Sequence, residues 1–103
     1  MYKYILNIFL LIPILLLGND YNLDIDSLND KAKEYIYIDL DSAYYFANRA
    51  VILSKHHQYK QGEMDGTFQL GRIYLNQARR VLSLESGTQS LKIADEIDSY
   101  KGK

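Results

Sequence analysis

The stretch YKQGEMDGTFQLGRIYLN, Tyr59 to Asn76, decides the fold of this chain. Its apolar residues recur three and four positions apart, the spacing of one face of an α-helix. They are Leu70, Ile73 and Tyr74 on one side, with Met64, Phe68, Gly71 and Leu75 beside them. A glycine inside a helix costs about 1 kcal/mol relative to alanine, so Gly71 indicates that another helix approaches closely there. The stretch predicts an amphipathic helix that packs through a wide face.

A polar stripe runs along the same helix beside its apolar residues. It consists of Asp65, Gln69, Arg72 and Asn76, which recur at positions i, i+4, i+7 and i+11 and therefore share one line. The predicted helix buries a wide surface and presents a narrow polar strip. The strip is either the solvated side of an amphipathic helix or part of a binding site, and the pattern alone leaves both open.

The composition limits what the rest of the chain can be. A length of 103 residues is enough for one small domain. A formal charge of −1 gives no electrostatic reason to expect nucleic acid as a partner of this region. There is no cysteine, which excludes disulfides, thiolate metal sites and cysteine-linked lipids.

The N-terminal segment, residues 1–18, has the pattern of a signal peptide. Lys3 precedes an apolar run from Ile5 to Leu17 that is shorter than the roughly 20 residues of a membrane-spanning helix. Gly18 is a small residue suited to cleavage, whereas Leu16 is unfavourable, so an uncleaved anchor formed by residues 5–17 is the alternative. In either case we expect the rest of the chain to be exported, periplasmic or secreted, with contact to a membrane only through this segment.

Four helices are expected after this segment. They span residues 24–35, 39–57, 59–76 and 80–97, followed by a polar tail, residues 98–103. Asp24 or Asp26 can cap the first helix, because an aspartate accepts the free backbone N–H groups of a helix start. Asp39 or Asp41 can do the same for the second. The run Tyr35 to Ile38 is interpreted as the frayed end of the first helix, since no second strand is expected to pair with it.

The last of these helices is the least regular. Its expected apolar contacts are Leu84, Leu91, Ala94 and Ile97. The segment Ser86-Gly87-Thr88 combines residues of low helix propensity and weakens the helix midway.

Small residues line up on the second helix and again, about 40 residues later, on the last. Small residues correspond to small ones and apolar residues to apolar ones: Ala43 with Ser83, Ala50 with Ser90, Leu53 with Ile93, and Ser54 with Ala94. A helix pair that repeats with a period between 20 and 50 residues points to a solenoid.

These features resemble the tetratricopeptide repeat. The unit Leu-Gly-x-x-Tyr matches the first helix of that repeat, and small residues match the sites where its second helix crosses. The residues that carry the resemblance are Ala43, Ala50, Leu70, Gly71, Tyr74, Ser83 and Ser90. The match covers residues 24–103 and is similar to the longer version of about 40 residues, which is common in exported N-terminal sensor regions of bacterial histidine kinases and helix-turn-helix regulators.

The resemblance implies an all-α fold of antiparallel helical hairpins stacked as a short tetratricopeptide-like solenoid. About two helix pairs fit the chain, a degenerate one over residues 24–57 and a second over 59–98. Thr67 departs from the family's usual tryptophan and Gly87 from a large aromatic. In such folds the first helix of each pair lines a concave face that binds peptides or a partner helix. The resemblance therefore makes the stripe a candidate peptide-binding groove: Asp65, Gln69, Arg72 and Asn76.

No pattern in the chain meets the requirements of a catalytic or metal site. His56 and His57 are adjacent on a helix, where side chains point about 100° apart and cannot easily share a metal. The aspartate pairs lack the loop glycine and the twelfth-position glutamate of a calcium loop. We therefore expect no enzymatic activity, catalytic residue, metal or cofactor, and a protein or peptide as the partner.

Two functions remain. The first is an exported helical-repeat protein-protein interaction module that forms the N-terminal sensory part, or a truncated copy, of a bacterial signalling protein. The second is a self-contained periplasmic or secreted scaffold that forms a homodimer through its last helix. Two repeats leave the last helix without the cover of a third, so we expect some of Leu84, Leu91 and Ile97 to be exposed and this helix to fray first.

Overall fold

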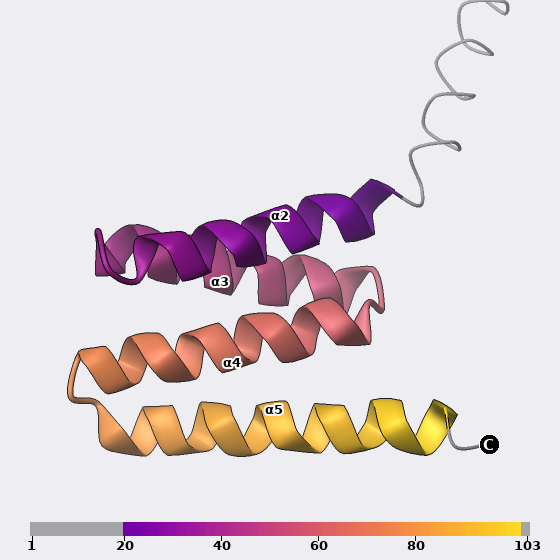
Figure 1. The fold of residues 1–103 in the computed structure, drawn as a ribbon. Helices are drawn as coiled ribbons and strands as arrows, with labels where there is room; N and C mark the ends of the chain where they lie inside the picture. The colour runs from indigo at the N-terminus through magenta and orange to yellow at the C-terminus, as the bar shows by residue number, and fades with distance from the viewer. Residues whose placement is uncertain (1–19, 102–103) are drawn as a thin grey trace, which may run out of the picture.

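The computed structural model describes residues 20–101, which form four helices joined by short turns. The helices are α2 (Asp20–Tyr35), α3 (Leu40–His56), α4 (Lys60–Asn76) and α5 (Arg80–Lys101). Each runs antiparallel to the one before it and packs against it (Figure 1). The prediction of an all-helical fold with sequential antiparallel packing is confirmed for these residues. The predicted signal peptide, residues 1–18, lies outside the described residues.

The helices differ in how many neighbours cover them. α3 packs against both α2 and α4, and α2 also contacts α4, so these three helices enclose a common core. α5 packs mainly against α4. In Figure 1, α2, α4 and α5 follow one another from top to bottom, with α3 behind the upper two and α5 at the lower edge.

The core of this three-helix unit is built from small and β-branched residues. Its buried members are Ala32, Ile36, Ala43, Ala47 and Ile73, with Tyr35, Leu40, Phe46 and Leu70 packed against them. The predicted line of small residues on α3 is confirmed, since Ala43, Ala47 and Ala50 are 0% exposed and Ser54 is 1% exposed. Small side chains on α3 let both neighbours come close.

The turns before and after α4 close in the same way. In each, a backbone N–H returns to the carbonyl five positions earlier: Tyr59 and Arg79 both donate at 2.8 Å. The residue before each donor is left-handed, with φ of 55° at Gln58 and 59° at Ala78. This arrangement is the Schellman helix end, which usually carries glycine at the left-handed position. It reverses the chain within a short turn and places α4 antiparallel to both neighbours.

The helix starts agree in part with the predicted caps. Asp39 caps α3: its Oδ1 accepts the N–H of Asp41 at 3.2 Å and its Oδ2 accepts the hydroxyl of Ser42 at 2.6 Å. The prediction that Asp24 or Asp26 caps the first helix is wrong, because α2 already begins at Asp20.

The end of the last helix also differs from the prediction. α5 continues to Lys101, so the segment expected to be a polar tail is helical as far as that residue. A helix needs no apolar residue to continue, because each added residue gains a backbone hydrogen bond once the helix is nucleated.

The closest backbone approach lies on the other side of α4 from the predicted one. A Cβ added at Gly62 would lie 2.5 Å from a side-chain oxygen of α3, and one at Gly66 would lie 2.7 Å from Val51. A Cβ at Gly71 would meet its nearest atom at 3.5 Å, an ordinary contact. The prediction that another helix approaches Gly71 is confirmed, because the backbone oxygen of Ser83 and the backbone nitrogen of Gly87 in α5 would lie 3.5 and 3.6 Å from that Cβ. The approach is less tight there than at Gly62 and Gly66, and the hydroxyl of Ser83 donates to the Gly71 carbonyl at 2.8 Å.

α5 faces α4 through its small residues rather than its leucines. Ser90 donates to the carbonyl of Met64 at 3.1 Å, and Ile93 is 1% exposed. Leu84 and Leu91 are 72% and 69% exposed, so their assignment as packing contacts within the fold is wrong and the expectation of exposed leucines is confirmed.

Two apolar residues of α4 are also outside the core. Phe68 is 53% exposed and Leu75 is 62% exposed, although the helical spacing placed both on the packing face. The packing face of α4 is thus narrower than predicted, and its apolar flank is open.

Candidate functional site on the α2–α4 face

The structure separates the four residues of the predicted polar stripe. Gln69 is 1% exposed and therefore belongs to the interior of the fold. Asp65 and Arg72 are half-buried, and Asn76 at the end of α4 is exposed. The stripe is thus not a uniformly solvated strip: its middle is covered because α2 lies beside α4.

Arg72 is the best-fixed charged group of this face. Its Nη1 donates to Oε1 of Gln69 at 3.1 Å and its Nη2 donates to the hydroxyl of Tyr37 at 3.0 Å. The guanidinium carbon lies 6.0 Å from the centre of the Tyr37 ring. Among the described residues no carboxylate forms an ion pair with Arg72. The guanidinium is therefore oriented by two neutral partners, and its positive charge is not balanced by a carboxylate of these residues. It has five N–H donors in all, so donors remain for a further partner.

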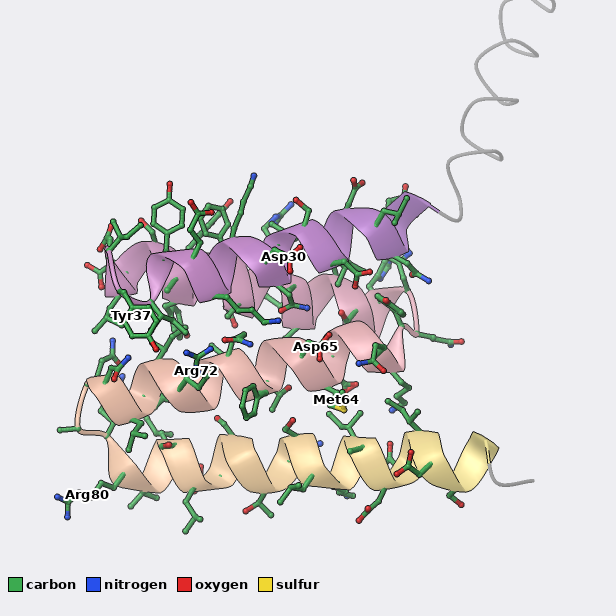
Figure 2. The ribbon with its side chains drawn as sticks, viewed as in Figure 1. Asp30, Tyr37, Met64, Asp65, Arg72 and Arg80 are labelled. Atoms are coloured by element: carbon green, nitrogen blue, oxygen red, sulfur yellow. The ribbon has the colours of Figure 1, made fainter. Side chains whose placement is uncertain are left out.

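A group of carboxylates lies next to it along the same face. Burial raises the pKa of Asp65 above its usual value, and the nearby charges of Asp26 and Asp30 raise it further, while the hydrogen bond from Gln61 and the charge of Lys33 lower it. Figure 2 shows Asp30 on α2 and Asp65 on α4 on the side of the molecule that also carries Tyr37 and Arg72. The face therefore has an acidic part and a basic part.

A partly buried hydrogen bond links the acidic part to the start of α4. The hydroxyl of Tyr59 donates to Oδ1 of Asp26 at 2.9 Å. Burial and this hydrogen bond raise the pKa of Tyr59 to about 12. The contact positions Asp26 and holds α2 and α4 at a fixed distance at this end of the face.

Sequence reasoning missed the residues that α2 and its turn contribute. Tyr37 belongs to the run that was interpreted only as a fraying helix end, and Asp30 follows no motif. Asn29 is 3% exposed and its Nδ2 donates to the carbonyl of Gly62 at 3.1 Å. The only signal was the position of Asn29, which continues the buried line of Ile25 by four residues.

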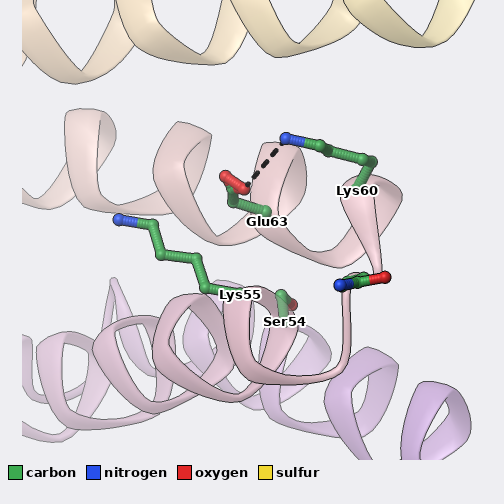
Figure 3. A pocket seen from close by; sticks show the side chains of 5 residues that line it. Ser54, Lys55, Lys60 and Glu63 are labelled. Atoms are coloured by element: carbon green, nitrogen blue, oxygen red, sulfur yellow. Dashed lines mark ion pairs between the residues drawn. The ribbon is translucent and has the colours of Figure 1, made fainter.

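A separate shallow pocket opens beside the α3–α4 turn (Figure 3). It is lined by Ser54, Lys55, Gln58, Lys60 and Glu63. Nζ of Lys60 lies 3.8 Å from Oε1 of Glu63 and 3.3 Å from Oε2 of Glu96. Lys60 therefore links the start of α4 to the C-terminal part of α5. The pocket places no activated nucleophile beside a base, and its charges serve an ion-pair network.

The two histidines occupy a structural position. His57 stacks on Tyr21 with ring centres 4.0 Å apart, and the ring of His56 stands edge-on to that of His57. Within residues 20–101 no group of histidine and carboxylate side chains could hold a metal ion. The histidines connect the end of α3 to the first turn of α2.

No protein-family model, curated protein or solved structure matches the chain. Over the described part of the chain, no helix is both long and apolar enough to cross a membrane.

Proposed function

We propose that this chain is an exported helical-repeat protein-protein interaction module that serves as the N-terminal sensory part, or a truncated copy, of a bacterial signalling protein. Its four helices are two tetratricopeptide-like pairs, α2 with α3 and α4 with α5. The order of packing supports this, because stacked hairpins require each helix to lie antiparallel to the one before it. The first helices of the two pairs, α2 and α4, lie side by side and form the recognition face.

The proposal rests on the fixed orientation of Arg72 and on its lack of an ion-pair partner among the described residues. The guanidinium is held by Gln69 and Tyr37, and the described residues supply no carboxylate to it. A half-buried arginine that is oriented in advance and lacks a counter-ion loses little freedom when it binds a carboxylate or a backbone carbonyl. The partner therefore places an acidic group or a main-chain oxygen at Arg72.

The acidic part of the face indicates which side chain the partner places there. At neutral pH the raised pKa of Asp65 means that its ionised form is less favourable in the folded chain than in the unfolded one. A lysine or arginine of the partner placed between Asp30 and Asp65 would relieve this cost. We therefore expect an extended or helical peptide with a basic side chain toward Asp65 and an oxygen toward Arg72.

The experiment compares capture of envelope proteins by the full chain and three variants. Arg72→Ala removes the guanidinium, Asp65→Asn removes the acidic charge, and Arg49→Ala removes an exposed arginine of α3 as a matched control. Proteins bound by the wild type and identified by mass spectrometry should be lost with Arg72→Ala and retained with Arg49→Ala. Equal capture by both arginine variants would refute the recognition face.

Asp65→Asn separates recognition from a purely structural role. Because the charge of Asp65 opposes folding at neutral pH, the variant should have a higher Tm while it captures less partner. A residue that only supports the fold would lose both together.

The sensory assignment has its own test. The DNA that follows the codon of Lys103 should continue in frame into a transmembrane segment and a kinase or DNA-binding region. A stop codon at that point would remove the sensor assignment and leave only the truncated copy, while the recognition face would still be tested by Arg72.

A further inference from the structure

A group of exposed apolar residues lies on the open side of α4 and α5. Its residues, with their exposed fractions, are Phe68 (53%), Leu75 (62%), Val81 (71%), Leu84 (72%) and Leu91 (69%). Gly87 lies among them, and a Cβ added there would meet no atom within 4 Å, so shallow grooves run beside it. Contiguous apolar surface of this kind marks an interaction site.

The α5 part of this surface is a regular seam. Val81, Leu84, Thr88, Leu91 and Asp95 recur at alternating steps of three and four residues and are all exposed. They point away from α4, with Leu84 and Leu91 on the flank that shares a groove with Phe68 of α4. This is the spacing through which two helices pair along their length.

The charges at the two ends of the seam have opposite signs. Arg80 lies at the start of α5 and Asp95 near its end, and both are exposed. If two α5 helices pair in antiparallel fashion with Leu84 of one opposite Leu91 of the other, Arg80 of each copy lies opposite Asp95 of its partner. A parallel pairing would instead place like charges together.

The opposite end of the helical stack offers a mixed surface to this seam. The exposed positions of α2 include Tyr21 and Leu23. Most of the others are charged: Asp24, Asp30, Lys31, Lys33 and Glu34. Stacking copies head to tail would bury these charges against leucines at a high desolvation cost. A two-fold pairing places the same apolar patch against itself.

We propose that the open side of α5 binds a second copy of this chain as an antiparallel, two-fold symmetric pair. Leu84 and Leu91 form its apolar centre and Arg80 pairs with Asp95 of the partner copy. Phe68 of α4 lines the edge of the contact beside Gly87. The pairing uses different residues from the recognition face of α2 and α4, so it does not depend on the proposed peptide binding.

Charge reversal tests the register without disturbing the core. Sedimentation of the full chain should show a monomer–dimer equilibrium. Arg80→Asp and Asp95→Arg should each weaken the dimer by at least about tenfold, and the double variant should restore it to within about threefold of the wild type. Both residues are exposed, so neither change threatens the fold.

Cross-linking tests the geometry independently. The chain has no cysteine, so any disulfide is formed by the residue introduced. Thr88→Cys lies near the expected two-fold axis, where two thiols can meet at disulfide distance. It should form a covalent dimer on oxidation. Gln89→Cys, its exposed neighbour on another side of the helix, is the control and should not.

Several results would overturn the pairing. A chain that sediments as a monomer up to about 1 mM has no meaningful self-affinity. A double variant that stays as weak as the single ones would show that Arg80 and Asp95 do not meet. Equal cross-linking of the Thr88→Cys and Gln89→Cys variants would show that the disulfides form by random collision of monomers and not in a specific dimer. Each of these outcomes leaves capture by the recognition face unaffected, so the two proposals fail separately.

Discussion

α3 and α5 both carry a line of small residues, but the two helices are covered to different extents. α3 lies between α2 and α4, and its small residues Ala43, Ala47 and Ala50 are fully buried. α5 has α4 as its main neighbour and leaves Leu84 and Leu91 on its open side. A similar line of small residues therefore occurs on an interior helix, α3, and on a half-exposed helix, α5. The number of neighbours, rather than the pattern itself, decides how much of a helix is buried.

The residue types at equivalent positions reflect this difference. Where α3 carries Ala43 and Ala50, α5 carries Ser83 and Ser90, whose hydroxyls donate to carbonyls of α4 at 2.8 and 3.1 Å. A hydrogen bond of this kind contributes about 0.5–1.5 kcal/mol net. α5 is thus attached partly by polar contacts to one helix, whereas α3 is held by apolar packing on two sides.

The largest expected effect comes from placing leucine at two positions 40 residues apart, one on α3 and one on α5. Ala47→Leu adds bulk to a site that is 0% exposed between α2 and α4, and it should destabilise the fold by about 3 kcal/mol. Gly87→Leu puts leucine at the matching position of α5, where an added Cβ meets nothing within 4 Å. It should be neutral or stabilise the fold by up to about 1 kcal/mol, because leucine has a higher helix propensity than glycine. Urea unfolding in dilute solution measures both, and similar losses would mean that α5 is covered as α3 is.

Hydrogen exchange tests the comparison without mutation. Backbone amides in the middle of α3 should exchange only on global unfolding, whereas those of α5 should open with a free energy lower by about 2 kcal/mol, or roughly 30-fold faster. The measurement requires a dilution at which copies are separate, because pairing through α5 would protect it. Equal protection of the two helices in the monomer would contradict the difference in cover.

Replacing glycines on the two sides of α4 should change the stability by smaller amounts. Gly66→Ala should destabilise the fold by about 1 kcal/mol, because the new methyl group would lie 2.7 Å from Val51, a clash that exceeds the gain in helix propensity. Gly71→Ala should be neutral or stabilising by up to about 1 kcal/mol, because its nearest neighbour toward α5 is at 3.5 Å. Gly71→Leu should still overpack the α5 contact by about 1–3 kcal/mol. Thermal unfolding ranks the three variants, and a destabilising Gly71→Ala would show that α5 lies closer than described.

Sequence patterns were sufficient for the helices but not for their orientation. The spacing of apolar residues over residues 59–76 identified α4 to within a residue at its start, because the α-helical period is strong there. It could not say which side of α5 faces α4. The leucine side and the side with Ser90 and Ile93 are both regular, and the hydrogen bonds that Ser83 and Ser90 donate to the α4 backbone show which side faces α4.

The recognition face was predictable only on α4. Arg72 was identified by its place in the polar stripe of α4. Its hydrogen-bond partner Tyr37 lies in the turn between α2 and α3, and no local sequence pattern links the two residues. Gln69 was expected on the surface because it is polar, and it is buried because α2 covers it. Contacts between residues distant in sequence depend on how helices are placed, and helical periodicity carries no information about that.

The next comparison concerns the hydrogen bond between Tyr59 and Asp26, which links α4 to α2. Its pKa is raised from the ordinary 10.0 to about 12 by burial and by the hydrogen bond to Asp26. A group whose pKa is higher in the folded chain than in the unfolded chain stabilises the fold fully below the unfolded pKa. This contribution is lost as the pH rises from about 10 to about 12. Tyr59→Phe should therefore lower the stability at pH 7 by about 0.5–1.5 kcal/mol and make it fall less steeply above pH 10.

The matched control is Tyr45→Phe, which removes a hydroxyl from a tyrosine of α3 that is 58% exposed. It should leave the stability at pH 7 within about 0.5 kcal/mol of the wild type. Denaturant unfolding between pH 7 and pH 12 compares the three proteins. If Tyr59→Phe and Tyr45→Phe respond alike across this range, the bond between Tyr59 and Asp26 does not stabilise the α2–α4 contact. The polar link between α2 and α4 would then rest on the hydrogen bond from Asn29 to the Gly62 carbonyl.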